Sequence, residues 1–578
     1  MKLLYTISLS WIALLCASQS YAQNTLYIPP ALTGTTFNLS AQSGTTTLFS
    51  GFNTPTYGIN GTWMAPTLII NKGDSVTFNV TNNLPVSTTI HWHGLHLPSK
   101  WDGGPHQIIN TGSIWSPRFK VMNDAATFWY HPHGDKKTEL HVSKGMAGMI
   151  IVKDAAEAAL TLPRTYGVDD IPVIIQSKAF DVLKQIAIAT EDDTTVFVNG
   201  TMQPYLNAPA QVIRLRLLNG STSRSFKLGF TGNLAFSLIG NDAGLLDTST
   251  TLTRIQIAPG ERYEILLNLT GKQSQTIYLK NFGTELTNGI HGSAQVGTTG
   301  GMIPGYVDNK LNGADFNVLK IMVTAPTSTP VTTIPTTLVP KSPFPISSVN
   351  KERTFLFLPE PPSTPDKMVE GPFLINGNSF DMNIVNDTVK LGHTEIWKLV
   401  NGTEIAHPFH IHDVWFYVLD INGVPPPLYE RGKKDVILVM PKDTVRFITK
   451  FEDFADPIVP FMYHCHLLHH EDEGMMGSFI VVDSTTSVKN YQQDNMIVKV
   501  YPNPAATSWL VEGGTDSKEI KVTLYDLMGK MLFTRLLSPV SGKFATSVNA
   551  DLLPVGLYVL KINSEFSTQT LQLLKSNY

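Results

Sequence analysis

One thiol, several imidazoles and a thioether fall within a single short segment of this chain, HCHLLHHEDEGM at residues 464–475. Cys465, His470 and Met475 follow one another at intervals of five residues, so one loop that leaves a strand is able to carry all three. A thiolate with two imidazoles and a distant thioether is the donor set of an electron-transferring copper site, and sulfur donors favour copper over hard cations. The segment therefore predicts a mononuclear copper site whose fourth ligand comes from elsewhere in the chain.

Pairs of histidines separated by one residue occur four times in the sequence. Random placement of 16 histidines over 578 positions would give roughly 0.4 such pairs. Side chains at positions i and i+2 of a strand point to the same face, so each pair is able to present two imidazoles to one metal cluster. We therefore expect eight histidines to converge on a second site, namely His91, His93, His131, His133, His410, His412, His464 and His466.

Cys465 lies between His464 and His466, so its side chain must point to the opposite face of the strand, towards a different metal ion. His407 stands three residues before His410, across a Pro-Phe step, and is able to face away from that pair. An electron that arrives at Cys465 then has a path of a few bonds to both flanking histidines. The predicted mononuclear set is His407, Cys465, His470 and Met475.

The other histidines occur singly, and a single histidine is more often a surface or hydrogen-bonded residue than a metal ligand. We expect this of His96, His106, His141, His291, His393 and His469. Met476, next to the predicted thioether ligand, is expected to belong to the core.

Length and composition limit the class of protein. The chain has 578 residues, of which 42% are hydrophobic, and this length favours about four globular domains. The net charge is −4 and no basic run is present, so nothing indicates nucleic-acid binding. We expect the partner to be a small molecule.

Residues 1–22 are typical of a secretory signal peptide. Lys2 precedes an apolar stretch, and Ser20-Tyr21-Ala22 forms a small-x-small cleavage site before Gln23. Its removal leaves Cys465 as the single cysteine, which excludes an internal disulfide, and metal binding would account for a free thiol in an oxidising compartment. No other apolar segment approaches 18 residues, so no transmembrane span is expected.

Strand-like alternation dominates the chain, as in NKGDSVTFNVTNNLP at residues 71–85, and predicts an all-β fold built from sandwiches. An internal repeat relates residues 128–154 to residues 461–483. Each unit carries a histidine pair on a strand and a later apolar strand that begins near a Gly-Met step. Pro132 takes the place of Cys465, so the first unit has no thiol ligand.

The segments HWHG, HPHG, HPFHIH and HCHLLHHEDEGMM resemble the four copper motifs of multicopper oxidases, the family of laccases, bilirubin oxidases and bacterial cuprous oxidases. The resemblance implies cupredoxin-like Greek-key sandwiches and four copper ions: one of type 1, one of type 2 and a type 3 pair. It assigns His91 and His410 to the type 2 ion. It assigns the other paired histidines to the type 3 pair, namely His93, His131, His133, His412, His464 and His466. Asp102 and Glu471 stand where the family has acidic residues that serve the cluster, and carboxylates are natural proton carriers.

The resemblance also implies the division of the chain. We expect cupredoxin domains at residues 23–155, 156–325 and 351–487, joined by a Pro/Thr-rich linker at residues 326–350. The middle domain has no histidine from 142 to 290 and is expected to act as a spacer. Residues 498–578, with VYPNPA and LPVGLYVLKI, resemble the C-terminal sorting domain of type IX secretion substrates; a small β-sandwich binding module is the alternative. A monomer that passes through the periplasm to the cell surface or medium, with the type IX machinery as partner, follows from this resemblance.

Three functions remain open. A laccase-like enzyme would oxidise phenols or aromatic amines one electron at a time and reduce O₂ to water. Copper-exporting relatives carry a methionine-rich insert, but the corresponding stretch here has only Met368 and Met382, which favours the organic substrates. Oxidation of Cu(I) or Fe(II) is the second possibility, with Glu404 near the electron-entry site as a metal or proton acceptor. A cupredoxin-fold structural protein without turnover is the third.

Overall fold

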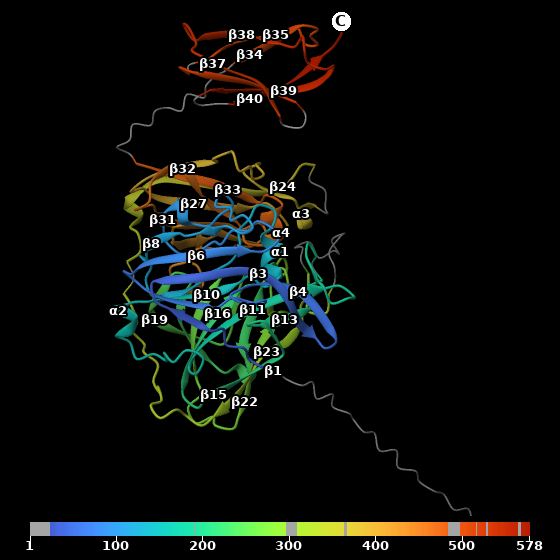
Figure 1. The fold of residues 1–578 in the computed structure, drawn as a ribbon. Helices are drawn as coiled ribbons and strands as arrows, with labels where there is room; N and C mark the ends of the chain where they lie inside the picture. The colour runs from blue at the N-terminus through green and yellow to red at the C-terminus, as the bar shows by residue number, and fades with distance from the viewer. Residues whose placement is uncertain are drawn as a thin grey trace, which may run out of the picture. The chain divides into compact units, whose positions relative to one another are not determined.

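The computed structural model describes residues 24–190, 192–295, 309–340, 342–362, 367–483, 497–515, 517–526, 530–564 and 568–577. The signal peptide expected at residues 1–22 lies outside the described residues. The chain divides into two compact units, Met1–Asp483 and Ser484–Tyr578. Within the described residues β-strands dominate and the α-helices are short (Figure 1), which confirms the all-β prediction.

The first sandwich has two sheets. One follows the order β2-β5-β10-β9, with β2 (Ala31–Thr33), β5 (Thr67–Asn71), β10 (Gly148–Lys153) and β9 (Ala126–Tyr130). The other follows β4-β3-β6-β7 with β8 on β6: β4 (Phe52–Ile59), β3 (Thr36–Phe49), β6 (Ser75–Asn83), β7 (Ile114–Trp115) and β8 (Arg118–Lys120). Alternate residues of β6 are buried, and both sheets contribute side chains to one hydrophobic core.

The middle sandwich is the largest. Its first sheet contains β1 (Asn24–Thr25), β15 (Pro204–Pro209), β23 (Asp315–Thr324), β22 (Thr276–Phe282), β17 (Phe226–Phe230) and β20 (Ile255–Ile257), in that spatial order. Its second contains β14 (Thr201–Met202), β13 (Thr195–Val198), β11 (Asp170–Phe180), β16 (Val212–Asn219), β21 (Arg262–Asn268), β18 (Phe236–Asn241) and β19 (Gly244–Leu252), with β12 (Ile186–Ala187) on β11. Every residue of β16 is buried, so both faces of this strand are covered by protein.

The third sandwich carries the cysteine. One sheet contains β25 (Phe373–Ile375), β24 (Val349–Pro359), β27 (Thr394–Asn401), β31 (Thr444–Lys450) and β29 (Phe416–Ile421). The other contains β26 (Asp387–Lys390), β33 (Met476–Val482), β32 (Asp456–Cys465), β28 (His407–Ile411) and β30 (Val436–Val439). Trp397, Phe409 and Phe447 are fully buried in the core that the two sheets share.

The C-terminal unit is a smaller sandwich with a core of its own around Trp509 and Val522. One sheet contains β34 (Ile497–Tyr501), β35 (Ser508–Gly514) and β38 (Lys543–Asn549). The other contains β37 (Met531–Leu537), β36 (Ile520–Tyr525), β39 (Gly556–Ser564) and β40 (Thr568–Lys575).

The helices are α1 (Thr138–Ser143), α2 (Ala155–Ala158), α3 (Lys367–Glu370) and α4 (Leu468–Asp472). None of the helices among the described residues has the length and hydropathy needed to cross a membrane. The expected linker at 326–350 is largely irregular before β24 begins at Val349, but it buries Leu338 in the middle sandwich core. Part of the expected linker therefore packs on the middle sandwich.

The two units of the internal repeat occupy equivalent places in the first and third sandwiches. Strand β9 pairs with β10 and strand β32 pairs with β33, both antiparallel. Tyr130 faces Gly148 in the first pair, and Tyr463 faces Gly477 in the second. A Cβ atom on either glycine would come within 2.5 Å of the tyrosine ring, so both positions require glycine for the same reason.

Candidate metal centre

The three predicted strong donors of the mononuclear site meet in the third sandwich. The Sγ atom of Cys465 lies 3.4 Å from Nδ1 of His407 and 3.7 Å from Nδ1 of His470. The register of β28 against β32 explains the meeting, because Phe409 stands opposite Cys465 and His407, two residues away, shares its face. All three side chains are buried.

Main-chain hydrogen bonds fix the loop that carries the remaining donors. The amide of Met475 donates to the carbonyl of His470 at 2.8 Å, and the amide of Cys465 donates to the carbonyl of Met475 at 3.0 Å. Met475 is fully buried in the same hydrophobic core as Cys465. The loop therefore returns the thioether residue to the neighbourhood of the thiol. Met476, the first residue of β33, is buried as expected.

The surroundings of this site favour neutral imidazoles. The ring of Phe373 packs against His407 and His470, with ring centroids 4.7 and 4.6 Å away. Burial lowers the pKa of His407 to about 3 and holds that of His470 well below its usual value, with a smaller contribution from neighbouring histidines. A neutral imidazole is the form that binds a metal ion. Burial also raises the pKa of the Cys465 thiol, and a bound cation would be needed to deprotonate it.

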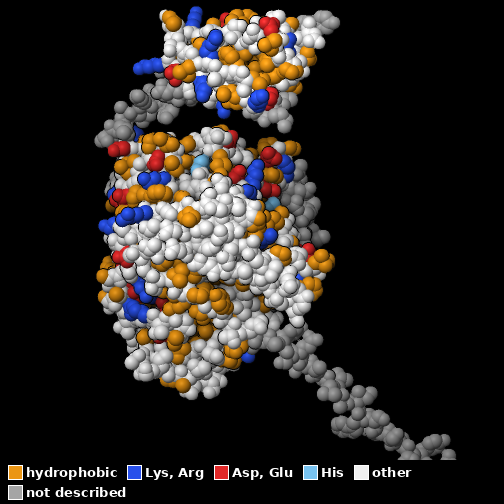
Figure 2. Space-filling view, in the orientation of Figure 1, with side chains coloured by type: hydrophobic (Ala, Val, Ile, Leu, Met, Phe, Trp, Pro, Cys, Tyr) orange, Lys and Arg blue, Asp and Glu red, His pale blue; other side chains and the backbone are white. Residues whose placement is uncertain are grey.

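The eight paired histidines converge between the first and third sandwiches. Three groups form in which all donor atoms lie within 4.8 Å of one another: His91, His93 and His410; His93, His131 and His466; and His133, His412 and His464. An isolated bridge joins His91 to His131, and strand pairing places His410 opposite His464. Each sandwich contributes four of these residues. Figure 2 shows histidine at few points of one face, in accord with the burial of the eight.

In several of these histidines, one ring nitrogen is hydrogen-bonded to the main chain and the other faces the cluster. Nδ1 of His91, His131 and His410 lies 2.8–2.9 Å from main-chain carbonyl oxygens, which makes each Nδ1 a donor. Nε2 of His91 and of His410 is buried and has no hydrogen-bond partner. Buried polar atoms without partners call for an explanation, and here nitrogen lone pairs that converge in a pocket fit bound metal ions.

Burial holds the pKa of most of these imidazoles low, with the other histidines adding to the effect. For His133 and His466 the value falls to about 3. The Nε2 atoms of His133 and His412 lie 3.1 and 3.3 Å from Nε2 of His464. Such close approach gathers nitrogen donors as a metal ion requires.

The two predicted acidic residues touch the cluster from opposite sides. Asp102 places Oδ2 2.7 Å from Nδ1 of His412, while Glu471 places Oε2 3.0 Å from Nδ1 of His464 and Oε1 3.3 Å from Nδ1 of His133. Burial alone would raise the pKa of Glu471, but the adjacent imidazoles outweigh burial and lower it. Both carboxylates orient imidazole rings and lie within one proton-transfer step of the site.

Two single histidines differ in environment. His469 is one-third exposed and lies near Glu139 and Glu473, so it is a spacer in the ligand loop. His96 is buried, with Nδ1 2.8 Å from Asp413 and Nε2 3.1 Å from Asp453. It is an internal ion-pair residue between the first and third sandwiches, and no metal group forms around it among the described residues.

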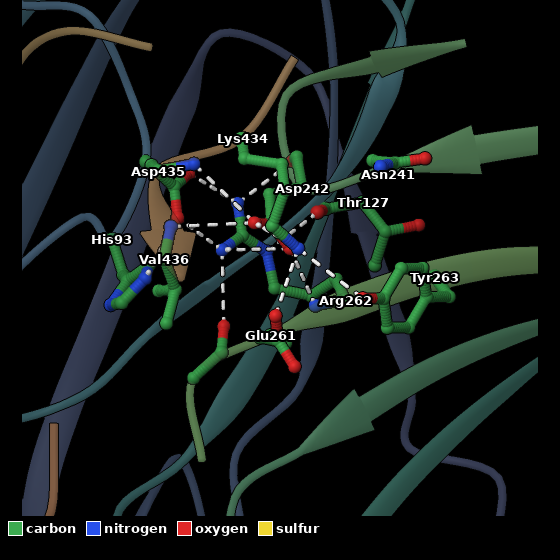
Figure 3. A network of polar contacts seen from close by, with 12 residues as sticks. His93, Thr127, Asn241, Asp242, Glu261, Arg262, Tyr263, Lys434, Asp435 and Val436 are labelled. Atoms are coloured by element: carbon green, nitrogen blue, oxygen red, sulfur yellow. Dashed lines mark hydrogen bonds and ion pairs between the residues drawn. The ribbon is translucent and has the colours of Figure 1, made fainter. Parts of the chain in front are cut away.

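The sequence missed a group of buried charges that reaches the cluster from the middle sandwich (Figure 3). Arg262 pairs with Asp435, whose Oδ1 lies 3.3 Å from Nε2 of His93. The middle domain is therefore more than a spacer, which corrects the expectation drawn from its lack of histidines. The available signal was the placement of charged residues, ER at 261–262 and KD at 434–435, directly at the start of apolar strands.

Comparison with known proteins decides the family. Profiles described as multicopper oxidase match residues 40–157, 176–301 and 345–485, and a secretion system C-terminal sorting domain profile matches residues 499–576. The chain belongs to the multicopper oxidase family. Its sandwiches are cupredoxin-like, as predicted, and its C-terminal unit is a sorting domain rather than a binding module.

Relatives in this family carry different names. The chain is 34% identical to multicopper oxidase mco of Staphylococcus haemolyticus over 77% of this chain and 88% of that protein. It is 31% identical to cell division protein FtsP of Photorhabdus laumondii over 81% of this chain and 94% of that protein. Among solved structures, the laccase-like multicopper oxidase CueO from Ochrobactrum sp. is 32% identical to this chain, and the match covers 79% of this chain and 100% of CueO with a TM-score of 0.70.

Proposed function

We propose that this multicopper oxidase is a secreted, laccase-like enzyme that oxidises phenols or aromatic amines and reduces O₂ to water. One observation carries the proposal: a buried thiol–imidazole site and an eight-histidine cluster meet on opposite faces of a single strand end, His464-Cys465-His466. A family member without turnover would have no need to keep both sites joined in this way.

The donor geometry supports the following assignment. His407, Cys465, His470 and Met475 would hold the type 1 ion. His91 and His410 would hold the type 2 ion. The type 3 pair would be held by His93, His131, His133, His412, His464 and His466, of which His93, His131 and His466 form one close group and His133, His412 and His464 the other. Bound copper supplies the one-electron redox chemistry, and the protein supplies geometry, potential and control of water access.

The chain's own residues would manage protons and electron entry. Asp102 and Glu471 are buried against the proposed ligand imidazoles and are placed to pass protons towards the cluster where O₂ would be reduced. The backbone from Cys465 to His464 and to His466 gives the electron two short covalent routes. Phe373 is fully buried and packs against both imidazoles of the mononuclear site, which keeps this part of the site apolar.

Oxidation of Cu(I) or Fe(II) is the second candidate, because Glu404 lies close to the mononuclear site in sequence. Its Oε1 is 2.9 Å from Nζ of Lys442, so a cation pairs with the carboxylate that would have to attract a metal ion. Met368 and Met382 are the only methionines of the stretch where copper-exporting relatives have an insert. Both observations favour organic substrates.

The experiment that tests this proposal uses one purified sample of the mature protein. Copper per chain is measured first, and steady-state rates are then measured with a phenol, with Cu(I) and with Fe(II). We expect about four copper ions per chain and the highest kcat/KM with the phenol. A higher value with either metal ion would replace the laccase-like assignment by a metallo-oxidase. Absence of copper and of all three activities would favour the third alternative, a structural role.

The sorting domain indicates secretion by the type IX system. We further propose transit through the periplasm, delivery to the cell surface or medium, and a monomeric enzyme. The proposed domain boundaries are 1–22 for the signal peptide, 23–155, 156–325 and 351–487 for the cupredoxin domains with the 326–350 linker, and 498–578 for the sorting domain. The profile matches support the division into three cupredoxin domains and a sorting domain, although β1 (Asn24–Thr25), inside the first proposed range, pairs with β15 of the middle sandwich.

A further inference from the structure

We propose that Arg262 of the middle sandwich is a positioning residue for the multinuclear site and acts through Asp435 on His93 and His410. This inference rests on the proposed copper function and adds a residue from the one cupredoxin domain that contributes no ligand.

Asp435 sets which nitrogen of each imidazole faces the cluster. Its carboxylate Oδ1 lies 3.3 Å from Nε2 of His93, and its main-chain carbonyl oxygen lies 2.8 Å from Nδ1 of His410. With these nitrogens occupied as donors, Nδ1 of His93 and Nε2 of His410 remain for metal ions. Nδ1 of His93 indeed lies 3.4 Å from Nε2 of His131 on the cluster side. A hydrogen bond to the second nitrogen is how proteins fix the orientation of a ligating histidine.

The guanidinium group of Arg262 binds the carboxylate of Asp435 with two hydrogen bonds, one to each oxygen. Nη1 and Nη2 donate to Oδ1 and Oδ2 of Asp435 at 2.5 and 2.6 Å. The remaining guanidinium donors bind main-chain carbonyl oxygens of Thr127, Gly260 and Asp242 at 3.1, 3.1 and 2.7 Å. All five donors of a fully buried guanidinium are therefore satisfied, and a planar fork matches a carboxylate in a way that an ammonium does not.

Neighbouring charges fix the main chain on both sides of this pair, as Figure 3 shows. Asp242 accepts the amide of Arg262 at 2.8 Å with Oδ1 and the amides of Asp435 and Val436 at 3.3 Å with Oδ2. Lys434 places Nζ 2.8 Å from Oε1 of Glu261. Residues 261–262 of the middle sandwich and 434–436 of the third are thus held as one rigid body.

Two glycines pack closely against this pair and against the cluster. A Cβ atom on Gly94 would lie 2.4 Å from Oδ2 of Asp435 and 2.8 Å from Nη2 of Arg262. A Cβ atom on Gly260 would lie 2.9 Å from the ring of His466. The loop before Arg262 therefore packs directly against the cluster. A displacement of Arg262 would move the imidazoles that contact this loop and Asp435.

Arg214 provides a matched control. It lies on β16, beside β21, is fully buried, and pairs with Glu157 and Glu264. Within the part of the chain that the structure describes, its hydrogen bonds and ion pairs involve neither Asp435 nor a proposed ligand. Replacing either arginine by lysine keeps the positive charge and removes guanidinium donors that bind buried carboxylates. Loss of a buried guanidinium paired with carboxylates is common to both variants, so a difference between them reports on the cluster.

The test measures copper affinity of the wild type, Arg262→Lys and Arg214→Lys by competition with a graded chelator, together with the electron paramagnetic resonance of the type 2 ion. We expect Arg262→Lys to weaken the multinuclear site by about 10- to 100-fold and to change the type 2 signal. The visible absorption of the Cys465 site should stay unchanged. Arg214→Lys should keep wild-type copper affinity and spectra even if its thermal unfolding temperature falls.

A second variant decides whether Arg262 acts through Asp435. Asp435→Asn should lower the copper affinity of the multinuclear site. The double variant, with Arg262→Lys added, should bind copper as tightly as the single variant of lower affinity. Wild-type copper affinity and spectra in Arg262→Lys, equal losses in Arg214→Lys, or additive losses in the double variant would overturn the inference. If the wild type itself bound no copper at this cluster, the proposed function would fail, which is a separate and recognisable result.

Discussion

At the scale of single residues, Cys465 belongs to the mononuclear site alone, so a substitution there distinguishes this site from the histidine cluster. Its thiol lies among His407, His470 and the apolar core, whereas the imidazoles on either side reach the cluster. Cys465→Ser should therefore remove the blue absorption, about one of four copper ions and the oxidase activity, while the fold and the cluster ions persist. Copper analysis and visible spectroscopy check this. A blue and active serine variant would refute the assignment of the thiolate.

Asp102 tests the proton supply. The change Asp102→Asn keeps the size of the side chain and its contact with His412 but removes the exchangeable carboxyl proton. Reduction of the type 1 ion by substrate should stay at the wild-type rate, while reoxidation by O₂ slows by about 10²- to 10⁴-fold, the usual contribution of general acid catalysis. Rapid-mixing kinetics separates the two half-reactions. Unchanged reoxidation would make Asp102 a purely orienting residue.

The ion pairs of His96 should make the free energy of unfolding depend on pH. Burial opposes a charge on its ring, but Asp413 and Asp453 outweigh burial and raise the pKa of His96 to about 9. Because this exceeds the unfolded value of about 6.5, the stabilisation is fully present below about pH 6.5 and is lost as pH rises through about 9. The shift corresponds to at most about 3 kcal/mol, since Asp453 is partly exposed.

Denaturant unfolding of the metal-free protein between pH 6 and pH 10 measures this loss. His96→Gln should reduce the loss of stability in that interval. His106→Gln is the control, because Nε2 of His106 contacts only the carbonyl of Met382 among the described hydrogen bonds, at 2.9 Å. An unchanged slope in His96→Gln would assign this pH dependence to other groups.

At the scale of elements, a carboxylate joins two short helices of different sandwiches. Asp472, the last residue of α4, accepts the amides of Thr138 and Glu139 at the start of α1, both at 3.0 Å. Helix α4 also carries His470 and Glu471, so this cap holds the ligand loop against the first sandwich. Asp472→Ala should lower the free energy of unfolding by about 1 kcal/mol, as for other lost helix caps.

Glu473→Ala is the matched control for this cap. Its carboxylate lies 3.3 Å from His469 in a partly exposed ion pair, which contributes little to stability. The two variants are compared by denaturant unfolding of the metal-free protein. Equal stability of Asp472→Ala and the wild type would show that the contact between α1 and α4 adds nothing.

Some contacts between these elements could be predicted from the sequence, and others could not. Strand periodicity was sufficient to place Cys465 and His407 on one face and His464 and His410 on the other, because the side-chain period of two is a local property. It could not find Arg262, Asp435 or the ion pairs of His96, because buried charges reveal their partners only when separate sandwiches meet. A charged residue next to an apolar strand is equally compatible with a solvated strand end.

At the scale of the whole molecule, the cluster is shared between distant parts of the chain. The first and third sandwiches contribute four histidines each, and the middle sandwich adds the arginine that holds Asp435. Copper binding would thus link residues more than 300 positions apart, as the contact between His133 and His464 shows. Folding of the catalytic unit and assembly of its metal site are therefore coupled, since ions that bind only the folded chain stabilise it.

The C-terminal sorting domain is independent of this assembly. All proposed ligands precede residue 476, and residues 498–578 contain neither histidine nor cysteine. The domain has its own core around Trp509, and the chain divides into separate compact units after Asp483. A chain truncated after Ser487 should therefore fold, bind the full set of copper ions and turn over a phenol at a near-normal rate, because no core of the catalytic unit loses a side chain.

Delivery is the property that truncation should abolish. In the native host, the truncated enzyme should be found in the periplasm as an active blue protein, whereas the full chain reaches the cell surface or the medium. Cell fractionation followed by copper analysis and a phenol assay of each fraction measures both properties. Copper lost from the truncated chain would contradict the independence of the two units. Truncated enzyme in the medium at the level of the full chain would contradict the sorting role, because export would then be directed by residues before 488.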